Sequence, residues 1–334
     1  MKLLITGGAG FIGSHTVVEL LNRNYELVIL DDFSNSDPKV LDRIEQITSK
    51  KPIFYEGNVC DKAILEKIFQ EHQIDGVIHF AGYKAVGESV KKPLRYYDNN
   101  LVSTLHLLEM MEKYECYKFV FSSSATVYGN PKELPIKETA PLTTTNPYGT
   151  TKLMIEQILR DVASTNPKWS IAILRYFNPI GAHESGLIGE NPKDIPNNLM
   201  PYILKVATKE LDHLNVFGND YPTQDGTGVR DYLHVVDLAL GHVKAIEYIE
   251  HHPGIEAYNL GTGEGHSVLE IVKTFEQVNQ VKIPYEIVAR REGDIAACYA
   301  DATRAHDMLG WRAEKDLETM CRDAYHFLEV GGKE

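Results

Sequence analysis

The chain has 334 residues, of which 43% are hydrophobic and 24% are charged. A chain of this length is expected to form two lobes rather than one core, and no apolar run approaches the roughly 20 residues that span a bilayer. The formal net charge of −13 opposes nonspecific attraction to nucleic acid and to anionic lipid. We therefore expect a globular protein that has neither nucleic acid nor a membrane as a partner.

The cysteines and histidines indicate a compartment and argue against a metal site. Four cysteines, Cys60, Cys116, Cys298 and Cys321, lie far apart without a Cys-x-x-Cys pair, and the first expected strand begins at Met1, which leaves no room for a signal peptide. The 13 histidines include no His-Glu-x-x-His pattern. We expect a cytoplasmic protein without a metal.

The first element is an apolar strand at residues 3–5, followed by the run TGGAGFIG at 6–13 and by a helical pattern. Gly8, Gly10 and Gly13 fit the G-x-G-x-x-G spacing, in which missing side chains allow a tight turn and the approach of a pyrophosphate to backbone N–H groups. The helix N-terminus then faces the anion. An ordinary glycine-rich turn is the alternative, so the motif needs support from a second feature of the chain.

That support comes from Asp31, which ends a second apolar run at residues 27–30, about 20 residues after the glycines. A carboxylate at this place accepts hydrogen bonds from ribose hydroxyls and repels a 2′-phosphate. The following residues 32–36 supply no arginine that could neutralise such a phosphate. We predict a dinucleotide site that prefers NAD over NADP.

Helices and strands continue to alternate along the chain. A helix is expected at residues 40–47, a strand at 52–56, and a second helix after Asp61, whose side chain can cap it. The next buried strand, at 76–82, ends in small residues, where a doubly wound sheet lets a cofactor approach. The pattern predicts a mainly parallel α/β sheet.

A cluster of hydroxyl side chains follows the next strand. A long helix is expected at residues 93–114 and a strand at 118–121, which runs into SSSATVYG at 122–129. A serine cluster is often only a solvated turn, but serines directly after an apolar strand lie at the ligand-binding edge of such a sheet. We therefore treat Ser124 as a candidate site residue.

Tyr148 and Lys152 lie four residues apart in the next helical pattern and so share a face. A phenol has an ordinary pKa near 10, and lowering it to about 7 requires on the order of 4 kcal/mol of differential stabilisation. A nearby ammonium and a cationic nicotinamide ring would supply part of that. After a dinucleotide motif and a serine-tipped strand, this pair is a candidate acid–base centre.

The last strand of this unit is expected at residues 170–178, where we place the boundary between a dinucleotide-binding lobe, 1–178, and a substrate-binding lobe, 179–334. The second part mixes a helix at 198–208, a short strand at 215–217, a glycine-rich segment, and a helix at 236–249. Parts of 230–262, including a strand at 257–260, are expected to return to the first lobe. In a net acidic chain, Arg230, Arg290 and Arg291 are candidates to bind a diphosphate.

Further segments complete a set of motifs: HFAGYKAVGES at 79–89, YYDNN at 96–100, LRYFNP at 174–179, PNNLMP at 196–201 and RREGD at 290–294. Together with the glycine motif and the serine run, they resemble the extended short-chain dehydrogenases/reductases and, within these, the UDP-glucose 4-epimerases. The resemblance spans almost the whole chain. It implies a doubly wound parallel Rossmann-type sheet of the α/β class, with a smaller mixed α/β lobe that binds substrate.

The motifs and the resemblance imply three groups of site residues. Ser124, Tyr148 and Lys152 are expected to perform the chemistry. The NAD-binding residues are expected to be Gly7, Gly10, Phe11, Ile12, Gly13, Asp31, Asn35, Ser36, Asn58, Val59, Phe80, Ala81, Gly82, Lys84, Asn99, Ser124, Tyr148, Lys152 and Phe177. The residues expected to bind the nucleotide sugar are Lys84, Ser124, Tyr148, Asn178, Asn198, Leu199, Asn215, Phe217, Arg230, Arg291, Asp294 and Cys298.

Two positions depart from the commonest family pattern. Asn58 stands where the family usually has aspartate near the adenine, although its amide oxygen can still accept a hydrogen bond. Thr150 and Thr151 replace a more usual Lys-Ser pair between the two catalytic candidates. A third comparison separates the chain from the related 4,6-dehydratases, which carry an aspartate and a glutamate where this chain has Ala125 and Thr126.

The resemblance implies an NAD-dependent isomerase that interconverts UDP-glucose and UDP-galactose by transient oxidation at carbon 4 of the sugar. Because Cys298 is small where some family members carry tyrosine, we expect the N-acetylated UDP-sugars to be accepted as well. A homodimer paired through the helices at 93–114 and 148–163 is also implied. The alternatives are a noncatalytic dinucleotide sensor and another nucleotide-sugar epimerase of the same family.

Overall fold

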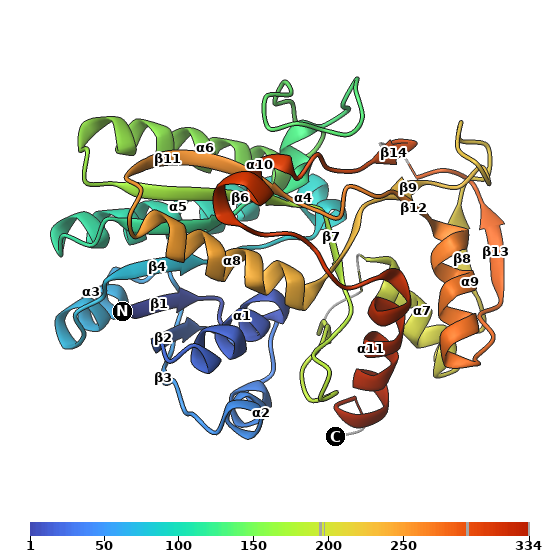
Figure 1. The fold of residues 1–334 in the computed structure, drawn as a ribbon, viewed down its shortest axis with the longest axis horizontal. Coiled ribbons are helices and arrows are strands. Elements are labelled where there is room, and N and C mark those ends of the chain that lie inside the picture. Colours follow the sequence, from blue (N-terminus) through green and yellow to red (C-terminus); the bar gives the residue numbers. More distant parts are fainter. Residues whose placement is uncertain (194–195, 197, 292–293, 333–334) are drawn as a thin grey trace.

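A seven-stranded parallel sheet organises the molecule (Figure 1). The computed structural model describes residues 1–193, 196, 198–291 and 294–332; Asn197, Glu292 and Gly293, which belong to two of the motifs, lie outside the described residues. The strand order is β3-β2-β1-β4-β5-β6-β11, and every neighbouring pair is parallel. The strands are β1 (Lys2–Thr6), β2 (Glu26–Asp31), β3 (Ile53–Glu56), β4 (Gly76–His79), β5 (Lys118–Ser122), β6 (Ser170–Tyr176) and β11 (Gly254–Leu260). The predicted doubly wound α/β sheet is confirmed.

Helices cover both faces of this sheet, and successive strand residues alternate between two cores. Leu3 and Ile5 pack in one core and Leu4 in the other. Burial on both faces explains why these strands read as continuous apolar runs. The first core includes side chains from α1 (Phe11–Asn22), α2 (Lys39–Thr48), α8 (Val235–Ile249) and α10 (Thr303–Leu309). The second includes side chains from α3 (Lys62–Glu71), α5 (Pro93–Lys113) and α6 (Pro147–Thr165).

Most expected elements are present, with ends that differ by a few residues. Asp61 caps α3 as predicted, its side chain accepting a hydrogen bond of 2.9 Å from the Ala63 amide. The expected strand at 76–82 ends at His79, and the chain then bends away through Gly82, whose φ is +156°. The expected strand at 170–178 divides, because β6 ends at Tyr176 and a new strand begins at Asn178.

The remaining elements gather beyond the carboxyl ends of the strands, on the side of Figure 1 away from the N-terminus. A third core joins residues of three helices there: α7 (Leu199–Ala207), α9 (Val268–Asn279) and α11 (Leu317–Val330). Short strands pair around them: β7 (Asn178–Ile180) with β10 (Tyr232–His234), β8 (Leu214–Phe217) with β13 (Tyr285–Val288), and β9 (Val229–Arg230) with both β12 (His266–Ser267) and β14 (Ala297–Cys298). Two short helical segments, α4 (Val86–Lys91) and η1 (Ala125–Tyr128), follow β4 and β5.

The chain crosses between these two parts more than once. After β10 it returns as α8, which packs on α1, and as β11, which pairs with β6 along residues 254–260. The boundary after residue 178 stays a prediction. In the part of the chain that the structure describes, no helix has both the length and the apolar character needed to cross a membrane.

Candidate active site

The glycine-rich turn joins β1 to α1 at the carboxyl edge of the sheet. Gly7 has a φ of +69°, and a Cβ there would lie 2.7 Å from the Ala81 amide nitrogen; at Gly13 a Cβ would lie 2.2 Å from the Gly7 carbonyl oxygen. Neither position accepts a side chain. Gly10 is the N-cap of α1 and provides no side-chain cap, so the helix begins with N–H groups directed toward the adjoining cleft.

A long cleft runs from this turn across the edge of the sheet, and its lining includes most of the predicted cofactor-binding residues. These are Gly7, Gly10, Phe11, Ile12, Gly13, Asp31, Asn35, Ser36, Asn58, Val59, Phe80, Ala81, Gly82, Lys84, Asn99, Tyr148 and Lys152. Ser124 and Phe177 are outside the lining; Phe177 packs in a small core with Tyr128 and Ile136. Their contact with a cofactor stays a prediction. The uncapped helix and the glycine cradle fit the pyrophosphate of a dinucleotide.

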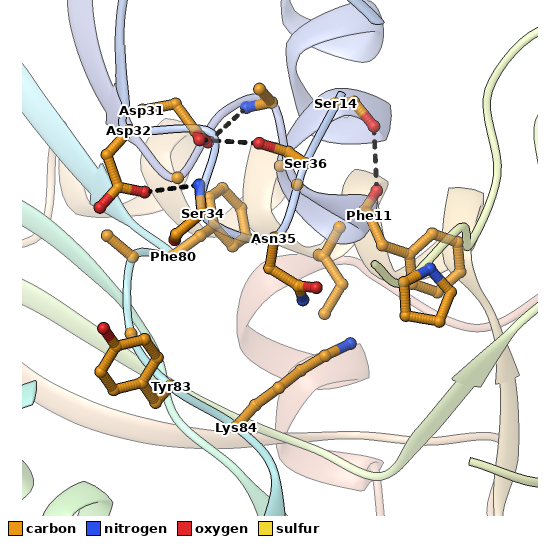
Figure 2. A pocket seen from close by; sticks show the side chains of 18 of the residues that line it. Phe11, Ser14, Asp31, Asp32, Ser34, Asn35, Ser36, Phe80, Tyr83 and Lys84 are labelled. Carbon is orange, nitrogen blue, oxygen red and sulfur yellow. Dashed lines mark hydrogen bonds between the residues drawn. The ribbon is translucent and has the colours of Figure 1, made fainter. Parts of the chain in front are cut away.

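Asp31 organises one end of the cleft, as Figure 2 shows. Its Oδ2 accepts a 3.0 Å hydrogen bond from the Ala9 amide, and its Oδ1 accepts from the Ser36 hydroxyl at 2.8 Å and from the Phe33 amide at 2.9 Å. Burial raises the pKa of this carboxyl above its ordinary value, and the three hydrogen bonds oppose that shift. The carboxylate thus fixes the loop in which Asn35 and Ser36 face the cleft.

The amide of Asn58, where the family usually has aspartate, is explained by its contact with Asp32, which is distant in the sequence. Its Nδ2 donates a 2.8 Å hydrogen bond to Asp32, and its Oδ1 accepts one from the Cys60 amide at 2.8 Å. An aspartate at this position would place a second carboxylate against Asp32. The oxygen expected to accept from an adenine therefore already has one donor, although a carbonyl oxygen can accept two.

Two of the three catalytic candidates, Tyr148 and Lys152, line the cleft. Pro147 and the Asn146 cap, which accepts a 2.8 Å hydrogen bond from the Gly149 amide, begin α6 so that Tyr148 is in its first turn. Lys152 lies one turn later, with Nζ donating to the Ser122 carbonyl oxygen at 2.7 Å and 6.0 Å from the centre of the Tyr148 ring. Both side chains are 6% exposed. Ser124 caps η1 and accepts hydrogen bonds from the amide and the hydroxyl of Thr126.

The pKa of Tyr148 differs from the expected direction. Burial raises it above the ordinary value, and a hydrogen bond with Ser124 opposes the increase. Burial also disfavours the charged form of Lys152, and it lowers the pKa of this ammonium to about 8. The expectation that the ammonium lowers the phenol pKa is therefore not met by the protein residues alone, because desolvation disfavours both charged forms. A bound cation beside the phenol would be needed to lower its pKa.

A buried ionic network supports this site. Arg175 belongs to the LRYFNP motif, but nothing in the sequence indicated Glu156 as its partner. Arg175 and Glu156 have side chains that are each 1% exposed, and two guanidinium nitrogens of Arg175 donate to the carboxylate. Glu156 also accepts a 2.7 Å hydrogen bond from Ser123, and Arg175 donates to the Tyr128 hydroxyl at 3.0 Å. The network joins the serine run of β5 to α6 and β6, so it fixes the strand end next to Tyr148.

Three of the predicted nucleotide-sugar residues, Lys84, Tyr148 and Asn198, line the cleft. The others lie outside its lining: Ser124, Asn178, Leu199, Asn215, Phe217, Arg230, Arg291, Asp294 and Cys298. The structure nevertheless brings some of these together, because Arg291 pairs with Asp294 at 2.9 Å and lies 4.9 Å from the Phe217 ring centre.

Cys298 and Arg230 face each other across the β14–β9 pair. Arg230 donates hydrogen bonds to the carbonyl oxygens of Val229 and Ile295, which hold its guanidinium near its own strand. Cys298 is half-buried against the small core that contains Phe177. The substrate roles of these residues stay predictions.

Comparisons with known proteins give the relationship of the chain. Residues 4–324 match the family model described as GDP-mannose 4,6 dehydratase. The chain is 60% identical to a UDP-glucose 4-epimerase of Pasteurella multocida, over 100% of this chain and 99% of that protein, and 59% identical to one of Bacillus subtilis, over 98% and 96%. It also superimposes on a Bifidobacterium longum UDP-glucose 4-epimerase crystallised with NAD+ and UDP, with a TM-score of 0.95, 57% identity and 98% coverage of each chain. The chain belongs to the UDP-glucose 4-epimerase family.

Membership of the UDP-glucose 4-epimerase family accords with the chemistry at the end of β5. Ala125 and Thr126 begin η1, and the Thr126 hydroxyl donates to Ser124 at 3.0 Å. Neither side chain can act as the carboxylate acid or base that a dehydratase needs, although the matching family model is named for a dehydratase. In this chain, residues 122–126 provide hydroxyl groups and no carboxylate.

Several cleft residues were not predicted. Glu88 accepts hydrogen bonds from Arg95 and from the Tyr96 hydroxyl, and all three line the cleft. The segment 187–192, between β7 and α7, also lines the cleft. The signal in the sequence was weak: the HFAGYKAVGES motif contains Glu88, but no spacing rule connects it to residues 187–192.

Proposed function

We propose that the chain catalyses the NAD-dependent interconversion of UDP-glucose and UDP-galactose. The observation that carries this proposal is the placement of Tyr148 and Lys152, buried side by side, in the cleft that begins at the glycine turn. The relationship to UDP-glucose 4-epimerases over the full chain supports the same substrates. The glycine turn, Asp31 and Lys84 are the residues proposed to hold NAD.

The protein's part in the reaction is to bind, orient and move a proton. Tyr148, ionised, removes the proton of the sugar 4-hydroxyl, and Ser124 hydrogen-bonds to the same hydroxyl. Lys152 stabilises the phenolate, and Ser122 fixes the ammonium through its carbonyl oxygen. NAD, when bound, supplies the hydride acceptor and later the donor at carbon 4. The 4-keto sugar turns over while its diphosphate stays anchored, and Tyr148 returns the proton.

Purified protein supplied with UDP-galactose tests the proposal. The expected result is formation of UDP-glucose. Part of the bound nicotinamide should also become reduced, which is measured by the absorbance of its reduced form. A noncatalytic dinucleotide sensor, the second candidate, would bind NAD without converting the sugar. Absence of turnover in protein that carries NAD would therefore contradict the proposal.

Asp31→Ala is expected to shift the preference between cofactors. The variant removes the carboxylate that repels a 2′-phosphate, so the affinity for NADP relative to NAD should rise by about tenfold, or 1.4 kcal/mol. Reconstitution of the stripped protein with each cofactor measures this ratio. Asp42→Ala, which removes the same charge from the exposed face of α2, is the control. An unchanged ratio in Asp31→Ala would contradict the assigned role.

We also propose that N-acetylated UDP-sugars are substrates. Cys298 is a small side chain, and burial raises the pKa of its thiol to about 11, so it is neutral at pH 7. A UDP-Glc/GlcNAc 4-epimerase of Campylobacter jejuni, 35% identical with a TM-score of 0.86, is among the similar structures. A small neutral group leaves room for an N-acetyl substituent.

Cys298→Tyr is expected to lower kcat/KM for UDP-N-acetylgalactosamine by about 10–200-fold and to leave UDP-galactose little affected. The reason is steric, because a ring would occupy the space that the N-acetyl group needs. Assays of both sugars on parent and variant measure it, with Cys298→Ala as the control that keeps the side chain small. Equal losses for both sugars would show that residue 298 does not select between them.

We propose a homodimer that pairs through α5 and α6. Large apolar side chains are exposed on these helices: Leu94, Leu105 and Met154, with Leu94 at 81%. Exposed apolar side chains of this size are typical of a protein–protein interface. A cytoplasmic location is proposed as well, supported by four free cysteines, of which Cys116 and Cys321 are buried.

A further inference from the structure

Asp231 lies between β9 and β10 and is fully buried. Its amide donates a hydrogen bond to the Cys298 carbonyl oxygen at 3.0 Å, and its own carbonyl oxygen accepts one from the Asn178 amide at 3.0 Å. Arg230 precedes it directly in the chain. These three neighbours, Arg230, Cys298 and Asn178, are all expected to bind the nucleotide sugar. Asp231 therefore lies where the strands that carry them meet.

The carboxylate of Asp231 joins two segments that are distant in the sequence. Oδ1 accepts hydrogen bonds from the amide and the hydroxyl of Thr262, at 2.8 and 2.7 Å. Oδ2 accepts from the amides of Gly263 and Ala300, at 3.1 and 3.0 Å. Thr262 and Gly263 follow β11 of the central sheet, and Ala300 follows β14, the strand of Cys298. The side chain thus fixes the β9–β14 pair against the end of the central sheet.

Gly261, the first residue after β11, allows this close approach. A Cβ at this position would lie 2.4 Å from Oδ2 of Asp231 and 2.7 Å from the Cβ of Ala300. A buried carboxylate costs free energy unless its oxygens are hydrogen-bonded, and here each oxygen accepts two bonds. Burial still raises the pKa of the Asp231 carboxyl, and the four hydrogen bonds oppose that increase. The loop and the two strands are therefore held at one fixed spacing.

We propose that Asp231 is a positioning residue that holds Arg230 where the diphosphate of the nucleotide sugar binds. This inference rests on the proposed function. The guanidinium of Arg230 depends on the β9–β14 pair, because its Nη1 donates to the carbonyl oxygens of Val229 and of Ile295, which precedes β14. Asp231 fixes that pair to the end of β11, and α6, which carries Tyr148, packs on β11 and β6. The anchor of the diphosphate thereby keeps its place relative to Tyr148.

Asp231→Asn tests this role, because the amide keeps the shape of the side chain but sets an NH₂ group against two donors in either orientation. UDP is expected to bind about tenfold more weakly than to the parent, as measured by calorimetry on the NAD-loaded protein. Loss of the negative charge next to Arg230 would by itself favour an anion, so a purely electrostatic effect has the opposite sign. In turnover, KM for UDP-galactose should rise by about the same factor while kcat changes by less than about threefold.

Asp237→Asn is the matched control. Asp237 is 2% exposed on α8, and its Oδ2 accepts hydrogen bonds from the amides of Glu314 and Lys315 at 3.0 and 2.9 Å. The same substitution at this second buried carboxylate should leave UDP affinity within about twofold of the parent.

Thr262→Val carries the test if Asp231→Asn does not fold. It removes one hydroxyl donor and keeps the amide, so UDP should bind about two- to threefold more weakly than to the parent. Unchanged UDP binding in Thr262→Val would then overturn the inference.

A double-mutant cycle with Arg230 separates positioning from a general structural effect. In an Arg230→Met background, Asp231→Asn is expected to change UDP affinity by less than about twofold, because the side chain that it positions is gone. Unchanged or tighter UDP binding in Asp231→Asn, or an equal loss in both backgrounds, would overturn the inference. A parent protein that binds UDP but does not convert UDP-galactose would instead contradict the proposed function, and the comparison of UDP affinities would still stand.

Discussion

Tyr148→Phe is expected to lower kcat by about 10²–10⁴-fold while binding of NAD and UDP stays within about twofold of the parent. The ring is 6% exposed and fills its place in the first turn of α6, so phenylalanine keeps the packing. What is lost is the oxygen that exchanges a proton with the sugar. Burial raises the pKa of the Tyr148 phenol above its ordinary value.

Steady-state rates with UDP-galactose, and calorimetry with UDP, measure the two halves of this prediction. Tyr176→Phe is a matched control, since Tyr176 is a second tyrosine that lines the cleft but lies at the end of β6. It should retain most of the parent activity. A Tyr148→Phe variant that turns over within about tenfold of the parent would remove Tyr148 from the role of general base.

Arg175→Met is expected to lower the free energy of unfolding by about 3–5 kcal/mol, because it leaves Glu156 as a buried charge without its partner. The side chains of both residues are 1% exposed, and the guanidinium also donates to the Tyr128 hydroxyl and to the Glu138 carbonyl oxygen. Denaturant unfolding measures the change, with the same NAD content in both proteins.

Two further variants make the result specific. Arg304→Met breaks the half-exposed pair with Glu256 and should cost about 1 kcal/mol or less. Adding Glu156→Gln to Arg175→Met should recover part of the loss, because the unpaired charge is then removed. If Arg175→Met destabilised the protein no more than Arg304→Met does, the buried pair of Arg175 and Glu156 would not stabilise the fold as proposed.

The sequence predicted the elements whose local pattern is strong. Continuous apolar runs marked β1, β2 and β5 because both faces of the sheet are covered, and the helix after Asp61 showed both a cap and a periodic apolar face. The spacing of Gly8, Gly10 and Gly13 predicted a tight turn, and Gly13 leaves no room for a Cβ. Gly7, which is outside that spacing, is the glycine of this turn with a positive φ. The spacing of Tyr148 and Lys152 predicted their common face.

What escaped prediction depends on contacts between distant residues. Asn58 is explained by Asp32, 26 residues away, and Arg175 meets Glu156 only once β6 lies beside α6. The pKa of Tyr148 followed burial rather than charge, because the depth of a side chain is a property of the folded chain. A hydrogen bond that Lys84 donates to Glu190 in the cleft spans 106 residues and has no periodic signal.

The return of β11 to the central sheet limits how this enzyme fold can be divided. A chain ending at residue 178 would lack both β11 and α8, so all seven residues of β6 would become an open edge and the face of α1 that packs on α8 would meet water. Exposed edges of this kind pair with other chains. Shuffling of nucleotide-sugar lobes between related enzymes therefore needs at least two junctions, one on each side of the α8–β11 segment, and cannot proceed by a single terminal exchange.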